Sequence, residues 1–157
     1  NSDGIVEIPI PSLVESYGQS AGKEKFYSLH WQQYDISGAF HMACVTYHNT
    51  NDGWYLVVPG HWTGHISLMR TENTSSLTVE HSIVFYYRGS QKDTPKPFLA
   101  IRQTRIDRAQ KSGRFVLRSD PGTIYSAEFF DCDWDCGLTE DTLKEQFHLI
   151  QPHWSND

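Results

Sequence analysis

Short segments in which apolar residues alternate with polar ones recur along most of the chain, with turn residues between them. Alternation with period two is typical of strands that bury one face, and Asn, Asp, Gly and Pro clusters are typical of turns. The connections are too short for crossover helices, so we expect a mainly antiparallel sheet. The pattern predicts eight or so strands, at 25–34, 39–47, from Trp54 to the Pro-Gly corner, 66–71, 77–88, 98–104, 114–118 and 123–130, with a short polar helix or turn at 106–112.

The segment from Gly53 to Trp62 has the densest aromatic pattern. A strand that begins Trp54-Tyr55 runs into Pro59-Gly60, and Trp62 follows this corner before the next strand leaves it. Large aromatic side chains suit the pleated surface of a sheet and bury much area. We therefore expect Trp54, Tyr55, Pro59 and Trp62 to serve packing and not chemistry.

The end of the chain has a helical pattern. Thr139 is a suitable N-cap, two acidic residues follow it, and Leu143, Phe147 and Ile150 recur at helical spacing. The prediction is a helix over 139–150 that packs on the sheet through these three residues, with Pro152 ending it. Together with the strands, this predicts an α+β fold: a mainly antiparallel sheet with a C-terminal helix packed on it.

The first 24 residues differ from the rest. A short apolar run is interrupted by Pro9 and Pro11, which exclude it from a central strand, and a polar stretch from Gly18 to Gly22 follows. We expect residues 1–24 to be an N-terminal extension or the end of an upstream repeat region, and residues 25–157 to form a single α+β domain.

Length, composition and charge limit the function classes. The chain has 157 residues, which suits one domain with a real core. A net charge of −6 with interspersed acids and bases argues against nucleic acid or an anionic membrane as the main partner. Within the sequence there is no apolar run long enough to span a membrane. The chain begins at Asn1, so we expect a removed targeting segment or a fragment of a longer protein.

The three cysteines divide into a lone residue and a close pair. Cys44 lies in an apolar-leaning run and is expected to be a small buried thiol. Cys132 and Cys136 lie in an Asp-rich turn, near enough to bridge if the turn bends. A zinc site is the alternative, but it requires two further ligands that the sequence does not identify.

Two other constellations resemble metal sites. His61 and His65 have the spacing of two zinc ligands, but Trp follows the first histidine where zinc hydrolases have Glu, and Pro and Gly make the segment a loop. Asp131, Asp133 and Asp135 are spaced like the first ligands of a calcium loop, yet the later positions carry Cys and Thr in place of Gly and Glu. We expect a solvated acidic turn before the last helix.

The sequence identifies no catalytic, cofactor-binding or metal-binding residues, and implies no cofactor. It contains no nucleophile elbow, phosphate-binding loop or dinucleotide fingerprint. Two function classes remain. One is a non-catalytic domain that binds a partner or has a structural role. The alternative is a hydrolase or metal-dependent ligand-binding protein, whose site assembles from residues distant in sequence, such as Asp and His across the sheet.

Four segments together resemble a known group of proteins: 53–62, 85–87, 98–101 and 138–150. Over about residues 45–150 the chain resembles uncharacterised secreted lipoproteins of Gram-positive bacteria, and the order of these motifs is similar to the PsbP-like α/β sandwich. The resemblance implies an extracytoplasmic domain, cell-envelope anchored or secreted. It also implies an unknown envelope or extracellular protein as partner, and membrane attachment only through a lipid anchor outside this chain.

The first eight residues are similar to the calcium-loop signature of FG-GAP-type propeller repeats, with Asn1, Asp3 and Glu7 in oxygen-ligand positions. The earlier ligands of such a loop would precede Asn1. This similarity suggests the C-terminal part of a longer lipoprotein. The likeness to secreted proteins also implies that Cys132 and Cys136 are oxidised, or close enough to oxidise.

Overall fold

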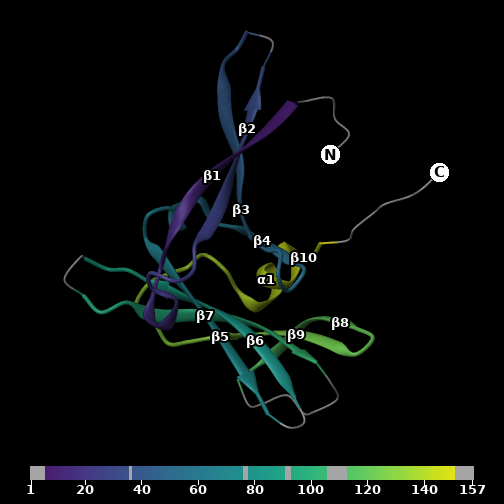
Figure 1. Cartoon of the computed structure of the whole chain (residues 1–157). Helices are drawn as coiled ribbons and strands as arrows, with labels where there is room; N and C mark the ends of the chain where they lie inside the picture. Colours follow the sequence, from purple (N-terminus) through teal and green to yellow (C-terminus); the bar gives the residue numbers. More distant parts are fainter. Residues whose placement is uncertain (1–5, 36, 76–77, 91–92, 106–112, 151–157) are drawn as a thin grey trace.

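The computed structural model describes residues 6–35, 37–75, 78–90, 93–105 and 113–150. Of these residues, 59% lie in strands and 10% are helical. The expected α+β class is therefore wrong, because the protein is mostly β (Figure 1). The described strands are β1 (Val6–Ser16), β2 (Phe26–Tyr34), β3 (Phe40–Asn49), β4 (Trp54–Val58), β5 (Ile66–Thr74), β6 (Val79–Tyr87), β7 (Lys96–Arg105), β8 (Phe115–Asp120), β9 (Thr123–Phe129) and β10 (Phe147–Leu149), with helix α1 (Glu140–Gln146) and the 3-10 turns η1 (Gly18–Ser20) and η2 (Gly60–Trp62).

These strands form one sheet in the order β10-β4-β3-β2-β1-β5-β6-β7-β9-β8. Neighbours are antiparallel except β1 and β5, which pair in parallel through Glu15–Ser67 and Ser16–Leu68. This short parallel pair joins two antiparallel halves into a mixed, nearly closed, barrel-like sheet. The expected antiparallel α/β sandwich is thus corrected. The physical reason is that β1 continues past its antiparallel partner β2 and reaches the edge of β5.

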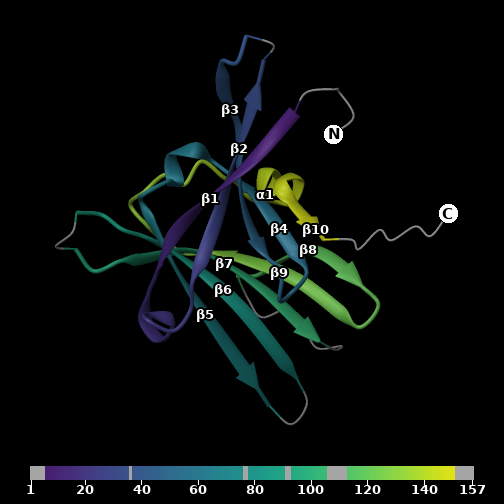
Figure 2. The ribbon, with the colours of Figure 1, turned by 45° about the horizontal axis from the view of Figure 1, so that its top comes forward.

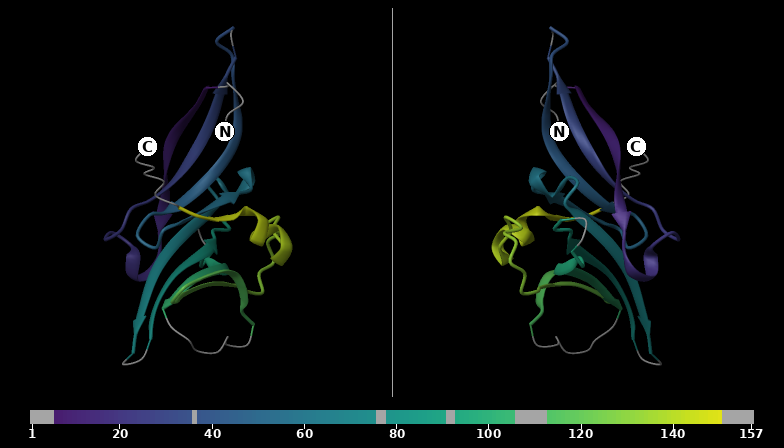
Figure 3. Two further views of the ribbon diagram at one scale, coloured as in Figure 1. Left: turned by 90° about the vertical axis from the view of Figure 1, so that its right-hand side faces the viewer. Right: turned by 90° about the vertical axis from the view of Figure 1, so that its left-hand side faces the viewer.

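Helix α1 lies beside the gap between the two ends of the sheet. It contacts β4 and β10 at one end and β8 at the other, and Lys144 of α1 lies 5.5 Å from the ring centre of Phe115 on β8 (Figure 3). The helix therefore covers the opening that the strands leave.

The core occupies the inner face of the sheet, between the two halves. Tyr47 of β3 packs edge-on against Phe85 of β6 at 5.5 Å, and Trp62 of η2 packs edge-on against Phe98 of β7 at 5.0 Å. Trp54 and Trp62 are each 1% exposed. The expectation that these two tryptophans serve packing is confirmed, and edge-to-face aromatic pairs of this kind add to the energy of burial.

Strand β1 includes the proline-interrupted run. It pairs with β2 from Val6 to Val14, but on its other side it pairs only through Glu15 and Ser16. Pro9 and Pro11 are two residues apart, so both direct their missing N–H groups to the same side of the strand. Among the described residues, no strand pairs with that side of β1 before Glu15. Proline is tolerated on such an unpaired side of a strand. Whether residues 1–24 end an upstream repeat region stays a prediction.

The C-terminal helix is shorter than the expected span of 139–150. Thr139 caps α1, since its Oγ1 accepts from the Thr142 N–H at 3.3 Å, and Leu143 is fully buried. Phe147 is fully buried too, but it is extended and begins β10, which pairs with β4. Ile150 is exposed. The predicted helical face is therefore wrong after Gln146, because hydrogen bonds to the edge of β4 replace those of a further helical turn.

The strands expected between residues 25 and 130 coincide with β2 to β9 to within a few residues at most ends, and are confirmed. The expected helix or turn at 106–112 lies outside the described residues.

Candidate functional site: an apolar arm and the cavity at its base

Strands β2 and β3 extend beyond the body of the sheet, with the first half of β1 beside them. Figure 2 shows this projection pointing away from β5 and β6, which extend in the opposite direction. We call the projecting part the arm and define it as Val6–Ile10 of β1, His30–Tyr34 of β2 and Phe40–Cys44 of β3. In Figure 3 the arm forms one end of the molecule, and one of its faces lies on the same side of the sheet as α1 and η2.

The pairing register places the apolar residues of the arm on its inner face, which continues the core face of the sheet. Val6 pairs with Tyr34, and Tyr34 pairs with Phe40, so the three side chains share a face. Six apolar residues of this face are each between 37% and 64% exposed, although such side chains normally gain from burial. They are Val6, Ile8, Ile10, Tyr34, Phe40 and Met42.

The inner face of the arm bears no Asp, Glu, Lys or Arg, since His30 and Gln32 occupy its remaining paired positions. The opposite face is polar near the tip. There Gln33 donates to Glu7 Oε1 at 2.7 Å and lies 2.8 Å from His41 Nε2. The tip of the arm is therefore amphipathic, with a hydrogen-bonded polar face and an exposed apolar one. Clustered exposed apolar side chains of this kind mark interaction surfaces.

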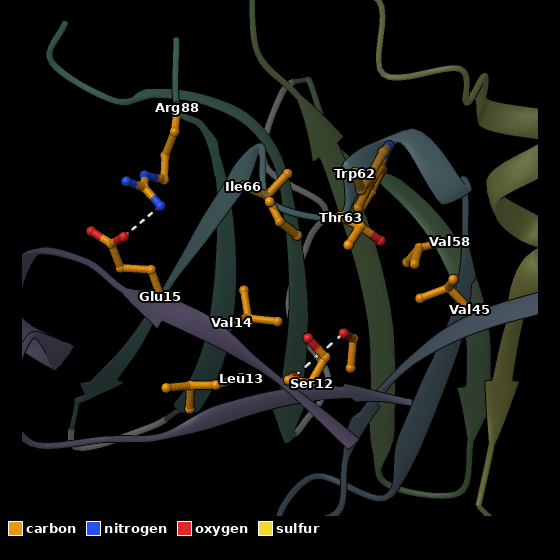
Figure 4. A pocket seen from close by; sticks show the side chains of 12 residues that line it. Ser12, Leu13, Val14, Glu15, Val45, Val58, Trp62, Thr63, Ile66 and Arg88 are labelled. Carbon is orange, nitrogen blue, oxygen red and sulfur yellow. Dashed lines mark hydrogen bonds and ion pairs between the residues drawn. The ribbon is translucent and has the colours of Figure 1, made fainter. Parts of the chain in front are cut away.

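A cavity of about 300 Å³ lies at the base of the arm (Figure 4). Its apolar wall includes Val14, Val45, Val58, Trp62 and Ile66, and its polar groups come from Ser12, Ser28 and Thr63. This volume is at the lower end of the range for small-ligand sites.

One side of the cavity carries an ion pair. The Arg88 guanidinium contacts the Glu15 carboxylate, and Figure 4 shows the two side chains joined there. Because each charge compensates the other, the cavity favours an uncharged apolar group over an anion.

The cavity and the inner face of the arm are continuous. Val45 lines the cavity and pairs with Val58 on one side and with His30 on the other. His30 in turn pairs with Ile10, which belongs to the apolar face of the arm. The two features therefore form a single surface that runs from the exposed tip of the arm to the interior.

Sequence reasoning missed this surface. The alternation Val6-x-Ile8-x-Ile10 and Phe40-x-Met42 is visible in the sequence, and it would have indicated one apolar face. The prolines of the first run argue against a central strand and so hide its alternation.

The two histidines with zinc-like spacing serve the packing of the loop after β4. His61 Nε2 lies 3.2 Å from the Asp135 carbonyl oxygen, and its ring packs edge-on against Trp134 at 5.4 Å. The backbone of His65 accepts from the Arg88 N–H and donates to the Trp62 carbonyl. The two residues thus hold the corner in place.

The acidic turn before α1 makes local contacts. Asp135 Oδ1 accepts from the Gly137 N–H at 2.8 Å, and Asp133 pairs with Lys96 at 3.1 Å on the surface. Of the three residues proposed for an upstream calcium loop, Glu7 accepts from Gln33 on the arm, while Asn1 and Asp3 lie outside the described residues.

All three cysteines are free thiols in the structure, so Cys132 and Cys136 are not bridged there. That the two are close enough to oxidise stays a prediction. Cys136 is buried, and its Sγ donates to the Leu138 carbonyl at 3.7 Å. Burial raises the pKa of the Cys136 thiol above its usual value. Cys44 is half-buried, not fully buried as expected, because β3 is leaving the body of the sheet at that point.

A buried polar network lies at the turn between β3 and β4. The Asp52 carboxylate contacts His81 Nδ1 at 2.8 Å, accepts from Asn49 Nδ2 at 2.7 Å and lies 3.8 Å from the Arg70 guanidinium. Its backbone carbonyl accepts from the Tyr125 hydroxyl at 3.2 Å. Both carboxylate oxygens are engaged, and neither Asp52 nor His81 lines the cavity. The sequence indicated only a hairpin turn here.

A second ion-pair cluster joins β6, β7 and β9. Arg102 contacts Glu128 at 2.9 Å, and Arg114 contacts Glu80 at 2.7 Å. Two bases and two acids compensate each other, and burial lowers the pKa of Arg102. The cluster therefore supports the sheet and carries no net positive charge that would attract an anion.

On the outer face, Tyr55 lies between two histidines. Its ring stacks on His48 at 5.0 Å and on His148 at 4.8 Å, so the stack crosses β3, β4 and β10. Burial lowers the pKa of His48. This stack explains the half-buried position of Tyr55 and confirms that it serves packing.

The described residues contain neither a metal-binding cluster nor a membrane-spanning helix. No group of three or more His, Cys, Asp or Glu residues among them is arranged to hold a metal ion. None of the helices in the described ranges is long and apolar enough to cross a membrane.

In comparisons with known proteins, no family model, curated protein or solved structure matches this chain.

Proposed function

We propose that this chain is a non-catalytic binding domain that contacts a partner through the inner face of the arm and the cavity at its base. The observation that carries the proposal is the set of exposed apolar residues on one face of the arm. Six of the nine exposed large hydrophobic residues in the described part of the chain lie there, and that face carries no Asp, Glu, Lys or Arg. A partner that covers them recovers the free energy that their exposure costs.

The alternative, a hydrolase that uses Asp and His across the sheet, has less support. Asp52 and His81 do meet across the fold, but Asp52 is saturated by its hydrogen bonds. No hydrogen bond within the described residues links His81 to a hydroxyl or thiol nucleophile. A Ser-His-Asp mechanism requires that link. The pair therefore fits a structural role.

The extracytoplasmic location is proposed on the resemblance over residues 45–150 alone. In that setting the domain belongs to an envelope lipoprotein, anchored by a lipid outside this chain, and its partner is another envelope or extracellular protein. Metabolic labelling of the full-length gene product with a fatty acid tests this part of the proposal. Absence of label in the membrane fraction contradicts it.

Binding of an apolar probe tests the surface itself. We expect the dye 8-anilinonaphthalene-1-sulfonate to become fluorescent with the native protein, and the double substitution Ile8→Ser/Phe40→Ser to remove most of this signal. Tyr27→Ser is the matched control, because Tyr27 is 46% exposed, pairs with Leu13 on the opposite face and does not line the cavity. It should retain most of the signal.

Unfolding in urea separates a binding surface from a structural one. Each substituted residue is exposed, so we expect each change to alter the free energy of unfolding by no more than about 0.5 kcal/mol. A loss of several kcal/mol in the double variant would show that the face supports the fold. Equal dye fluorescence in all three proteins would contradict the proposed surface.

A further inference from the structure

The arm has one backbone edge that lacks a partner. Strand β3 pairs with β2 from Phe40 to Tyr47, but β4 covers its other side only from Val45 to Asn49. Across the described ranges no strand pairs with that side of Phe40–Cys44. Alternate N–H and C=O groups there point outward, and such groups are a template for pairing with another chain.

The edge of β3 lacks most of the features that normally prevent pairing. Phe40–Cys44 contains no proline and no Lys, Arg, Asp or Glu. The opposite edge of the arm differs, since Pro9 and Pro11 of β1 cannot donate. The arm is therefore blocked against strand addition on the β1 side and open to it on the β3 side.

The open edge leads to the cavity. Strand β4 ends at Val58, which pairs with Val45, and the chain then turns away into η2. A segment paired with Phe40–Cys44 would continue the line of β4 along the arm. Its end nearest the body would reach Val45 and Val58, which line the cavity together with Trp62.

A second copy of this chain fits the surface less well than an extended peptide. Three strands and five residues make a face of about 14 Å by 17 Å, or on the order of 250–500 Å² with side-chain relief. A stable interface needs roughly 800 Å² from each partner. The register shift opposite Trp31 and Gln32 also bends β3, so an added strand must follow this twist. A flexible segment follows it more easily than a second preformed arm.

We infer that the partner contributes an extended segment that pairs as a strand with Phe40–Cys44. It places alternate apolar side chains over the inner face of the arm, and an apolar side chain at its end enters the cavity. This inference rests on the proposed binding function and specifies the class of partner. Backbone hydrogen bonds supply affinity in such strand addition, and the side-chain positions supply specificity.

Selection from a phage-displayed library of random dodecapeptides on the immobilised protein tests the inference. We expect the selected peptides to show apolar residues with period two. In hydrogen exchange, a bound peptide should protect amides within Phe40–Cys44 and leave those of the β1 edge unchanged.

Two neighbouring substitutions on β3 give a matched comparison. Met42→Lys places a charge on the apolar face at the open edge, whereas His41→Lys places the same charge on the polar face one residue away. Loss of a central contact typically exceeds a tenfold change in Kd. We therefore expect Met42→Lys to weaken binding of a selected peptide by at least about tenfold, and His41→Lys to change it little.

Three outcomes would overturn the inference. Selected peptides with helical spacing, or without protection at Phe40–Cys44, would contradict strand addition while the dye result upholds the binding surface. A dimer in sedimentation, with these amides already protected in the protein alone, would assign the edge to a second copy. Failure to select any peptide, together with no dye binding, would overturn the proposed function as well.

Discussion

Replacement of Trp62 by alanine tests whether the corner after β4 holds the two halves of the sheet together. Trp62 is 1% exposed, and its ring packs edge-on against Phe85 at 5.5 Å and Phe98 at 5.0 Å. Its Nε1–H donates to the Cys136 carbonyl at 2.7 Å. The residue thus links η2 to β6, to β7 and to the turn before α1.

The expected decrease in the free energy of unfolding of Trp62→Ala has two contributions. Truncation of a buried tryptophan costs about 3–5 kcal/mol. The Cys136 carbonyl also loses its donor, which costs about 1–3 kcal/mol when the acceptor stays buried. Water that enters the enlarged cavity offsets part of the second loss, so we expect a total of about 4–5 kcal/mol. For a chain of this length, this corresponds to a fall in Tm of roughly 8–20 °C.

Urea unfolding followed by far-UV circular dichroism measures the loss without relying on tryptophan fluorescence. Trp62→Phe separates the two contributions, because it keeps most ring contacts and removes the donor, at a cost of about 1–3 kcal/mol. It also keeps the test open if Trp62→Ala does not fold. Trp31→Ala is the control at a half-buried tryptophan on the arm and should cost clearly less. A Trp62→Ala midpoint within about 1 kcal/mol of wild type would refute the assigned role.

Three further predictions concern buried groups. Thiol titration in denaturant without reductant should find three thiols, and a count of one thiol contradicts the structure. In the native protein, the buried Cys136 should react with iodoacetamide more slowly than the half-buried Cys132. Burial lowers the pKa of His48 in the folded state, so as the pH falls the unfolded chain takes up a proton on this histidine before the folded protein does. The free energy of unfolding should therefore decrease as the pH drops below about 6.5. His48→Gln should flatten this part of the plot of stability against pH, and an unchanged plot contradicts the assignment. Asp52→Ala should cost about 3–5 kcal/mol in urea unfolding, because it removes the buried carboxylate that contacts His81 and Asn49 and lies 3.8 Å from Arg70. Glu140→Ala, which removes a surface pair, should cost under about 1 kcal/mol.

The central strands could be predicted from the sequence because their cues are local. Alternating residues and turn signals near Asp52-Gly53 and Pro121-Gly122 identified strand boundaries on both sides. The fold class could not be predicted, because it depends on β1 and β10. The position of Phe147 in the sequence fits a helical spacing as well as a strand. It becomes a strand residue because β10 pairs with the edge of β4. Propensity yields to tertiary contacts at such positions.

The candidate site was less predictable than the fold. Its arm has a readable alternation, but the sequence does not state where a strand leaves the core and its apolar face becomes exposed. The cavity is lined by residues of β1 to β5, of η2 and of the segment after β6, which meet only once the sheet has curved. Apolar positions alone do not separate a core face from a binding face.

The pairing of β10 with β4 has a consequence for how the protein is made. Leu56 of β4 pairs with Phe147 of β10, which lies far along the chain from it, so this contact joins residues with a very long separation in sequence. Contacts of this kind form late and slow folding. During translation Trp54 lacks its cover from Phe147 until α1 has emerged from the ribosome. A nascent chain that stalls after Gln146 presents a free β4 edge beside an uncovered aromatic core, which makes it a target for aggregation and for chaperones.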